Sequence, residues 1–504
     1  MTIKKVGFDN EKYLKEQSQS ILDRAVRFGN KLYLEFGGKL IYDYHASRVL
    51  PGFDPNVKMR LLKCLEGKIE VIICIHAGDI ERRKVRADFG ITYDNDTMKL
   101  IDDLREGNIK VCALVVTRYN GQPVVKQFMN KLERRGIEVV THQSIKGYPN
   151  NIDLIVSEDG YGVNQYIETS KPIIIVTAPG PGSGKLATCL SQIYHEHKRG
   201  IEAGYAKFET FPIWNLPLKH PVNMAYESAT ADLGDFNQVD PFHLESYKIT
   251  AINYNRDVEI FPVVKKIMLR IMGNKLVYKS PTDMGVNKAA CAIINDDLVQ
   301  QAAKQEMIRR YFRYRCEYAM GVADKKTVQR AELLMKELNL TPIDRKVVEH
   351  AHQASIDAQE KGKGNEGVFA GAALQLENGT IVTGKNSPLM HASLILNAIK
   401  ELAGIPDNIH LLSPNILNSI SNLKSEFFNH ERLSLNLGET LIALSISADF
   451  NPSAKVAMEK LKELNGCEMH STHMPTPGDE AGLRRLGLNI TSDPNFSSKR
   501  LFIT

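Results

Sequence analysis

A glycine-rich segment between residues 172 and 188 is the part of the chain best suited to chemistry. It reads Pro-Ile-Ile-Ile-Val-Thr-Ala-Pro-Gly-Pro-Gly-Ser-Gly-Lys-Leu-Ala-Thr, an apolar β-branched run followed by glycines and by a lysine that opens a helical pattern. Glycines let successive backbone N–H groups turn toward one anion, and the N-terminus of the following helix adds positive potential. The segment therefore predicts a phosphate-binding loop in which Lys185 neutralises phosphate charge.

The segment departs from the P-loop signature at two positions. Gly184 and Lys185 match it, but Pro179 replaces the first glycine, and Leu186 replaces the Ser/Thr that would hold Mg²⁺. The dinucleotide fingerprint is not met either, because its third glycine would fall at Lys185. The alternative is therefore a structural glycine-rich turn with a solvated lysine. The predicted binding residues are Gly180, Gly182, Ser183, Gly184, Lys185 and Thr188.

Polar residues follow the predicted strands in the first third of the chain, where strand-like and helix-like patterns alternate. Such alternation is typical of a parallel sheet wrapped by helices, and ligands bind at the carboxyl ends of its strands. Of the residues at those ends, Asp79, Glu158 and Asp159 are the candidates for holding Mg²⁺ or acting as a base. The others are His76, Arg118, Tyr119, His142 and Gln143. The predicted strands are 70–75, 111–117, 137–141, 152–157 and 173–177, with helices at 95–106 and 124–135.

A histidine-containing segment near the end of the chain is a second candidate site. Cys467, His470 and His473, with Asp479 and Glu480, are side chains of the types that bind transition metals. Their spacing completes no known set of ligands, so a proline-stiffened loop whose histidines hydrogen-bond to the backbone is the alternative. We expect the latter, with no tightly held metal.

The region from residue 363 opens with a strand (368–376), an Asn-Gly turn, a second strand (380–384) and a helix (391–402). This order resembles the start of the cytidine-deaminase-like fold, in which His-Ala-Glu on the first helix supplies a zinc ligand and the acid/base. Here the residues are His391-Ala392-Ser393, and no Pro-Cys-x-x-Cys follows. The resemblance is therefore architectural only.

Composition limits the classes of protein. The chain has 504 residues, of which 43% are hydrophobic and 24% charged, so it exceeds one core and predicts several folded domains. The net charge of +5 is mild and mixed along the chain, which argues against a nucleic-acid or membrane surface. The N-terminus lacks the apolar core of a signal peptide, and the seven cysteines include no Cys-x-x-Cys pair. We expect a cytoplasmic protein.

Helical patterns dominate the middle of the chain, at 262–272, 297–321, 324–338 and 344–361. The second of these carries arginines interleaved with aromatic residues, which could bind nucleic acid but more often form buried ion pairs at a domain or subunit interface. We therefore expect a homo-oligomer that binds no nucleic acid. The arginines are Arg309, Arg310, Arg313 and Arg315. The expected domains are an α/β P-loop-like domain (1–235), a mostly helical domain (236–362) and a C-terminal α/β subdomain (363–504), with a linker at 360–367.

Four longer segments are more specific than any single motif. Together they resemble the bacterial domain-of-unknown-function family numbered 1846, over essentially the whole chain. The resemblance implies an α/β part with a P-loop-like segment, a helical middle and a separate C-terminal subdomain, and it implies no particular activity. The segments begin at His76 (His-Ala-Gly-Asp-Ile-Glu-Arg-Arg-Lys), Thr177 (Thr-Ala-Pro-Gly-Pro-Gly-Ser-Gly-Lys-Leu-Ala-Thr-Cys), Lys207 (Lys-Phe-Glu-Thr-Phe-Pro-Ile-Trp-Asn-Leu-Pro) and His470 (His-Ser-Thr-His-Met-Pro-Thr-Pro-Gly-Asp-Glu).

Three functional hypotheses follow. The first is a protein that binds a nucleotide such as ATP, with Mg²⁺, or a small phosphorylated metabolite at the loop from Gly180 to Lys185; as an enzyme it would transfer or hydrolyse phosphate. The second is a metal-dependent hydrolase that uses His470 and His473. The third is a non-catalytic scaffold or assembly protein whose glycine loop is structural.

Overall fold

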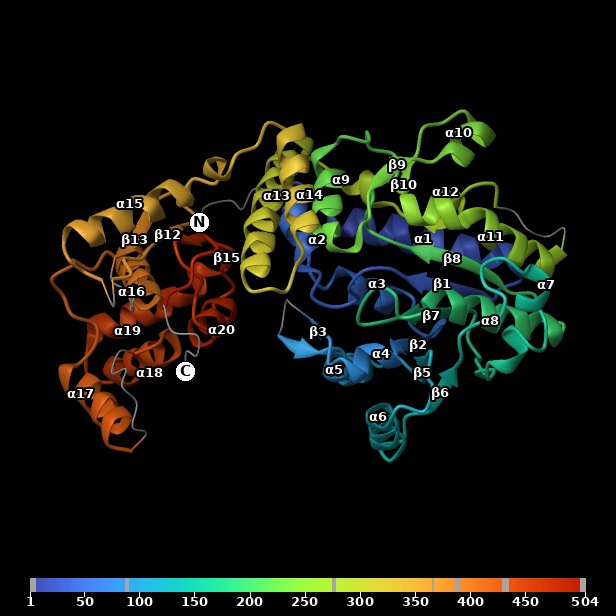
Figure 1. Cartoon of the computed structure of the whole chain (residues 1–504), viewed down its shortest axis with the longest axis horizontal. Coiled ribbons are helices and arrows are strands. Elements are labelled where there is room, and N and C mark those ends of the chain that lie inside the picture. Colours follow the sequence, from blue (N-terminus) through green and yellow to red (C-terminus); the bar gives the residue numbers. More distant parts are fainter. Residues whose placement is uncertain are drawn as a thin grey trace. The chain divides into compact units, whose positions relative to one another are not determined.

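A computed structural model describes residues 6–86, 90–273, 278–364, 367–385, 390–427 and 435–498. Among the described residues the chain forms two compact units, residues 6–303 and residues 304–498 (Figure 1). The sequence divides the chain differently, after residues 235 and 362. The helical middle region of that division is shared between the two units.

The first unit is built on a parallel sheet that has seven strands among the described residues, which confirms the predicted α/β class. Its two central strands are buried along their whole length, as expected where helices cover both faces of a parallel sheet. The strand order is β11 (Gly285–Val286), β8 (Gly204–Phe208), β1 (Leu32–Phe36), β7 (Ile173–Thr177), β2 (Ile69–His76), β5 (Val111–Thr117) and β6 (Val139–His142).

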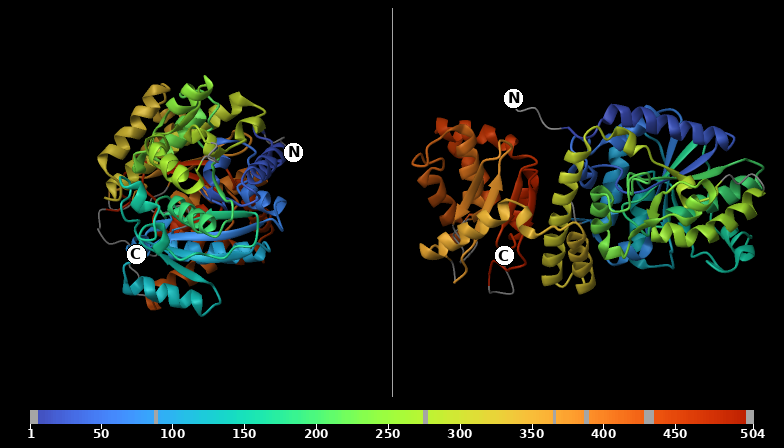
Figure 2. Two further views of the ribbon diagram at one scale, coloured as in Figure 1. Left: turned by 90° about the vertical axis from the view of Figure 1, so that its right-hand side faces the viewer. Right: turned by 90° about the horizontal axis from the view of Figure 1, so that it is seen from above.

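Helices cover both faces of this sheet (Figure 2). The connection from β7 through α8 (Lys185–Lys198) to β8 runs along the sheet in the opposite direction to the connection from β5 through α6 (Pro123–Glu133) to β6. Because such crossovers are right-handed, α8 and α6 lie on opposite faces. The other helices of this unit are α1 (Asn10–Arg27), α2 (Tyr44–Val49), α3 (Val57–Cys64), α4 (Ala77–Glu81), α5 (Tyr93–Glu106), α7 (Ile152–Ile155), α9 (Pro221–Ala229), α10 (Pro241–Tyr247), α11 (Asn255–Met272) and α12 (Pro281–Met284). The short antiparallel pairs are β3 (Val85–Arg86) with β4 (Ile91–Thr92), and β9 (Asn237–Val239) with β10 (Ile252–Tyr254).

The glycine loop leaves the middle of this sheet. Strand β7 pairs in parallel with β1 on one side and with β2 on the other, so the loop after Thr177 emerges between the carboxyl ends of both neighbours. The loop then leads directly into α8. The predicted succession of buried strand, glycine loop and helix is therefore confirmed, although the phosphate-binding role is not tested by this arrangement.

One predicted strand, at 152–157, is wrong, and three strands of this sheet, β1, β8 and β11, were not predicted. Residues 152–155 form α7, whose first turn is capped by Asn151: its side chain accepts a hydrogen bond from the Leu154 amide at 3.0 Å. Short apolar runs do not distinguish strand from helix by periodicity, and here the Asn151 cap favours the helix. Two of the missed strands, β1 and β8, carry the charged residues Glu35 and Lys207 within short apolar runs.

The second unit contains a four-stranded sheet in the order β13 (Ile381–Lys385), β12 (Gly371–Gln375), β14 (Glu468–Ser471) and β15 (Asn489–Ser492). Strand β12 is antiparallel to both neighbours, whereas β14 and β15 are parallel. The predicted hairpin and the helix after it are confirmed as β12, β13 and α16 (Met390–Ala403). The other helices are α13 (Asp296–Ala319), α14 (Lys325–Glu337), α15 (Val347–Glu360), α17 (Pro414–Asn422), α18 (Leu437–Ala448), α19 (Pro452–Glu459) and α20 (Pro477–Arg485).

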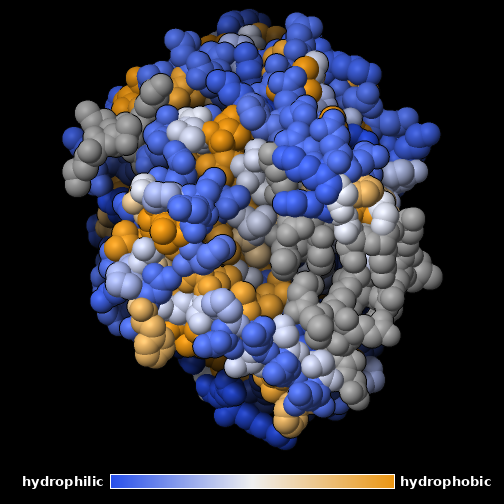
Figure 3. Space-filling view, turned by 90° about the vertical axis from the view of Figure 1, so that its left-hand side faces the viewer, coloured by the Kyte–Doolittle hydropathy of each residue, from blue (hydrophilic) through white to orange (hydrophobic). Residues whose placement is uncertain are grey.

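The surface of the second unit is partly apolar. Ile442 and Ile446, one turn apart on α18, are 61% and 43% exposed, and Phe450 just beyond the helix is 84% exposed. Figure 3 shows apolar patches between hydrophilic side chains on this side of the molecule. No helix among the residues described above is long and apolar enough to cross a membrane.

Candidate functional site

The glycine loop is held in a specific shape by its own polar groups and by close contacts. Ser183 donates its hydroxyl to the carbonyl of Gly180 at 2.8 Å, and Thr117 at the end of β5 donates to the carbonyl of Ser183 at 2.9 Å. Gly184 has φ of +85° and touches Thr117, because a Cβ at this glycine would lie 2.8 Å from the methyl carbon of that threonine. The loop is therefore fixed by β5 before any ligand binds.

A row of backbone N–H groups points away from any protein acceptor at the start of α8. Within the described residues, the amides from Gly182 to Ala187 donate no hydrogen bond, and the first amide to do so is that of Thr188, to the carbonyl of Gly184 at 3.0 Å. Unpaired amides of this kind, on a left-handed glycine and a helix N-terminus, are the groups that bind anions in proteins.

Lys185 lies beside this row and already faces a carboxylate. Its Nζ lies 3.9 Å from Oε1 of Glu35, and only 12% of the lysine side chain is exposed. The other carboxylate oxygen of Glu35 accepts a hydrogen bond from the hydroxyl of Tyr205 at 2.8 Å. The lysine is thus anchored by β1, and it is less free than a solvated loop lysine would be.

A second charge cluster lies at the end of the neighbouring strand β8. Lys207 Nζ is 2.9 Å from Oε1 of Glu209 and 2.5 Å from Oδ2 of Asp257. Burial opposes the charge of the lysine, yet Asp257, Glu209 and Glu35 together raise the pKa of Lys207 above its usual range. Burial raises the pKa of Glu209 to about 7, against the attraction of Lys207. A carboxyl group that titrates near neutrality suits general acid–base chemistry.

Two of the predicted site residues lie close to the loop but are engaged in other contacts. Thr188 is fully buried, and its hydroxyl accepts a hydrogen bond from the Cys74 thiol at 3.4 Å, so it faces β2. Asp79 is buried at the start of α4 and pairs with Arg82 at 2.6 Å and with Lys84 at 3.9 Å. Asp79 follows His76, the register partner of Thr117, and therefore shares the sheet edge with the loop.

The other two predicted acids are not brought to the loop. Glu158 and Asp159 are exposed and follow α7, not a strand of the sheet. Glu158 accepts a hydrogen bond from the Tyr194 hydroxyl at 3.1 Å and pairs with Lys198 at 2.8 Å, at the far end of α8. At a rise of 1.5 Å per residue, Lys198 is about 20 Å along the helix from Lys185.

Sequence reasoning missed the charged residues on and just after β1 and β8, of which Glu35 faces Lys185. Glu35, Lys207 and Glu209 were not identified because β1 and β8 were not predicted as strands. The signal was present, since a single charge within a short apolar run marks a charge that the fold must bury and pair. The segment that begins at Lys207 was also among those on which the family resemblance was based.

A narrow pocket lies beside the loop. Ala178 and Pro179, which begin the loop, line it together with residues 39–42 after β1 and with Asp96 and Lys99 of α5. Its free volume is ≈ 20 Å³, which is room for about one water molecule.

The five metal-binding candidates of the C-terminal segment do not converge on one point. Cys467 is buried in the apolar core of the second unit. The Nδ1 of His473 lies 3.0 Å from the hydroxyl of Thr472. Asp479 accepts a hydrogen bond from the Leu437 amide at 2.8 Å. The remaining two candidates also have other partners: His470 lies near Thr491 and Asp493, and Glu480 pairs with Arg484.

The arginine-rich helix forms ion pairs, as expected. Arg309 binds Glu306 and Glu468, both at 2.8 Å, and Arg310 binds Glu306 at 3.0 Å. The side chains of both arginines are about 90% buried. They are therefore committed to carboxylates of the second unit.

Comparison with known proteins covers nearly the whole chain. Residues 6–339 match the family described as Domain of unknown function DUF1846, N-terminal, and residues 343–502 match Domain of unknown function DUF1846, C-terminal. A UPF0371 protein of Clostridium botulinum strain Alaska E43 / Type E3 is 57% identical, and one of strain Kyoto / Type A2 is 56% identical. Each similarity extends over 500 residues and covers 99% of both chains.

Proposed function

The chain belongs to the DUF1846 family, and we propose that the N-terminal domain of this protein binds the phosphate group of a nucleotide or of a small phosphorylated metabolite at its glycine loop. The observation that carries the proposal is the row of unpaired amides from Gly182 to Ala187 beside Lys185. Such a row is costly to leave without an acceptor, and water or an anion must supply one.

The surroundings of the loop favour an anion. Ser183 and Gly184 are fixed by Thr117, so the amides do not have to be ordered when the ligand binds. A phosphate at the start of α8 would also place a second negative group near Lys185, which Glu35 holds in position. The lysine would then bridge the carboxylate and the phosphate.

The small pocket limits what can be attached to the phosphate. With ≈ 20 Å³ free between Ala178, Pro179 and α5, the pocket does not accommodate a nucleobase as it stands. The part of the ligand beyond the phosphate therefore lies outside this pocket or displaces Lys39 or Tyr42 from its wall.

The acidic residues supply the chemistry if the protein is an enzyme. Glu209 lies near Glu35, which faces Lys185, and its pKa of about 7 suits proton transfer to or from a phosphoryl acceptor. Asp79 shares the sheet edge with the loop and would be the candidate ligand for Mg²⁺, which would neutralise phosphate charge. Glu158 and Asp159 take no part, because they lie at the other end of α8.

Thermal unfolding of the full chain with added anions tests the binding proposal. Inorganic phosphate, pyrophosphate and ATP, each with and without Mg²⁺, are titrated against the parent protein and against two variants. We expect at least one of the three to stabilise the parent, by about 2.7 kcal/mol at a hundred times its Kd. Lys185→Ala should lose that stabilisation. Lys198→Ala, at the exposed end of the same helix, should keep it.

Lys185→Ala should also lower the melting temperature without ligand, because it leaves Glu35 buried with Tyr205 as its hydrogen-bond donor. The ligand-induced shift is therefore compared within each variant. Equal shifts in Lys185→Ala and the parent would contradict the proposal. No shift with any of the three anions would favour the scaffold hypothesis.

A further inference from the structure

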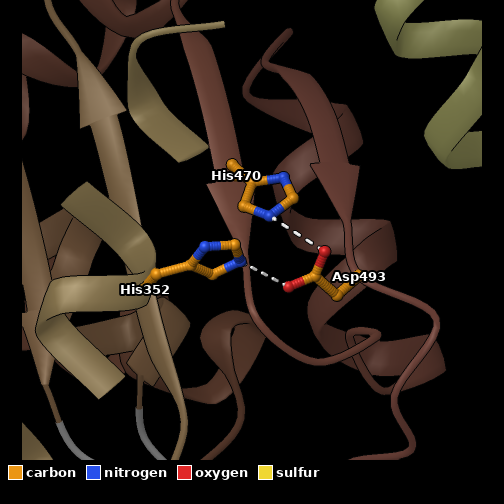
Figure 4. Close-up of side chains that lie close together, drawn as sticks. All are labelled: His352, His470 and Asp493. Carbon is orange, nitrogen blue, oxygen red and sulfur yellow. Dashed lines mark hydrogen bonds and ion pairs between the residues drawn. The ribbon is translucent and has the colours of Figure 1, made fainter. Parts of the chain in front are cut away.

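Three residues in the second unit place nitrogen and oxygen atoms of metal-binding types close together. They are His352, His470 and Asp493, whose candidate ligand atoms all lie within 4.8 Å of one another (Figure 4). His352 Nε2 is 2.7 Å from Oδ2 of Asp493, and His470 Nε2 is 3.7 Å from Oδ1. Both imidazoles point toward the same carboxylate.

The sheet positions these groups. His470 in β14 is the register partner of Thr491 in the parallel strand β15, so Asp493, just after that strand, lies next to His470. The backbone amide of Asp493 donates to the carbonyl of Ser471 at 3.0 Å, which extends this pairing. His352 comes from α15, which packs on β14.

The hydrogen bonds around Thr491 determine which nitrogen of His470 carries the proton. Thr491 donates its single hydroxyl proton to the carbonyl of Met469 at 3.0 Å and accepts a hydrogen bond from Nε of Arg345 at 3.0 Å. Its oxygen lies 3.0 Å from Nδ1 of His470, so with that proton committed it must accept one from Nδ1. The Nε2 of His470 is then a lone-pair acceptor.

This lone pair has no partner. His470 is fully buried, and its Nε2 has no hydrogen bond among the described residues. It faces the carboxylate of Asp493, which is also an acceptor. His470 is fully buried and the Asp493 side chain is 17% exposed, and two acceptors that face each other across 3.7 Å in such surroundings are unfavourable unless a positive group lies between them.

We propose that a divalent transition-metal ion binds between His352, His470 and Asp493. Two imidazoles and one carboxylate are a ligand set used for Zn²⁺ and Fe²⁺, with bonds of about 2.0 to 2.2 Å. Ligand atoms around such an ion are about 3.0 to 3.5 Å apart. The two imidazole nitrogens lie 2.7 and 3.7 Å from the carboxylate oxygens and no separation exceeds 4.8 Å, so an ion requires small movements of these side chains. The ion replaces the proton that His352 shares with Asp493.

The surroundings have the features of a supported metal site. The hydrogen bond from Nδ1 of His470 to Thr491 fixes the ring, as outer partners of metal-bound histidines do. The guanidinium of Arg345 donates from Nε to Thr491, not to His470, and it pairs with Glu468, which offsets part of its charge. The side chain of His352 is 46% exposed, so the site is reachable from solvent, and three protein ligands leave a coordination position for water.

This site shares His470 with the metal site considered from the sequence, but it uses neither Cys467 nor His473. It also lies in the other unit from the glycine loop, so it neither depends on nor supports the phosphate proposal.

The test is metal binding by the full, untagged chain. The protein is stripped with a chelator and titrated with Zn²⁺ by calorimetry and with Co²⁺ by visible absorption, which reports the ligand geometry. Three variants are compared: His352→Ala, Asp493→Asn and the control His350→Ala. His350 is a histidine of the same helix whose Nδ1 lies 3.0 Å from the carbonyl of Lys346. His352 is on the surface, so its removal does not endanger the fold.

We expect one ion per chain in the parent and in His350→Ala, with affinity falling at least tenfold in His352→Ala and in Asp493→Asn. The Co²⁺ bands should disappear in both of these variants. Equal binding in all four proteins would show that the metal binds elsewhere. Absence of stoichiometric binding in the parent would also overturn the proposal.

Discussion

The two candidate sites each contain polar groups without a protein partner, and these groups are of opposite kind. At the glycine loop the unpaired groups are donors, the amides from Gly182 to Ala187. At the histidine pair of the second unit the unpaired group is an acceptor, Nε2 of His470, beside the carboxylate of Asp493. Surplus donors favour an anion and surplus acceptors favour a cation.

The comparison shows that the charge of the ligand expected at each site depends more on unpaired hydrogen-bonding groups than on nearby charged residues. Lys185 suggests an anion site by its charge, but Glu35 already offsets that charge, and it is the amides that remain unpaired. Arg345 would argue against a cation near His470, but Glu468, which also pairs with Arg309, offsets part of its charge. At each candidate site the unpaired hydrogen-bonding groups therefore indicate the ligand better than the nearby charged side chains do.

The largest effect is expected where the second unit pairs its buried arginine. Arg345 is 1% exposed and donates to Glu468, Thr491, Met469 and Asn489. Arg345→Met leaves Glu468 with fewer partners and should lower the free energy of unfolding by about 3 to 5 kcal/mol. Chemical denaturation followed by circular dichroism measures the loss.

The matched control is Arg313→Met, whose side chain is 36% exposed and pairs with Glu317 within the same helix. It should cost about 0 to 1 kcal/mol. Similar losses in the two variants would mean that the buried charges of the second unit are not paired as described.

An intermediate effect is expected in the loop. Gly184→Ala forces a Cβ to 2.8 Å from Thr117 at a φ of +85° and should cost about 1 to 3 kcal/mol, with loss of any phosphate response. Gly182→Ala has φ of +73° but open space around its Cβ, so it should cost about 1 kcal/mol. Thermal unfolding with and without phosphate measures both quantities. A phosphate response that survives in Gly184→Ala would separate the anion site from the loop geometry.

The third effect concerns pH. The pKa of Glu209 is raised to about 7 in the folded chain from a usual 4.5, so the folded state binds this proton more tightly than the unfolded state does. Stability from this group is therefore greatest at low pH and falls as the pH rises from about 4.5 to 7. Glu209→Gln should flatten that decline, by at most about 3 kcal/mol.

Glu158→Gln is a control in which the change of stability with pH is expected to have the opposite sign. The hydrogen bond from Lys198 lowers the pKa of Glu158, so its contribution is present above the unfolded pKa and is lost as the pH falls. Melting temperatures of both variants and the parent between pH 4 and 8 measure the difference. A pH dependence in Glu209→Gln identical to that of the parent would contradict the burial argument.

The sequence predicted the parts of the fold that are contiguous in the chain. The strand at 173–177, the glycine loop and α8 follow one another directly, and β5 was predicted with its observed bounds. The strand predicted at 152–157 failed because four apolar residues fit a capped helical turn equally well. The approach of Tyr205 to Glu35 joins residues 170 positions apart, which no local pattern encodes.

Contacts between residues far apart in the chain also explain why the metal-binding residues were wrongly grouped from the sequence. Sequence spacing grouped His470 with Cys467 and His473, which are near in the chain. Strand alternation and core packing separate them, and the sheet brings His470 to Asp493 and His352 instead. His352 had no motif around it, and only the packing of α15 on β14 reveals its position.

The separation of these partners along the chain has a consequence for folding. His352 and Asp493 are 141 positions apart, and β12 pairs with β14 across about a hundred residues. Contacts between residues so far apart in the chain form late in folding, because a long loop must close, at a cost in entropy, before the contact stabilises the chain. The cluster does not exist in an unfolded or half-assembled chain. An ion would bind only after the sheet has formed. Once bound, it would slow unfolding of the second unit.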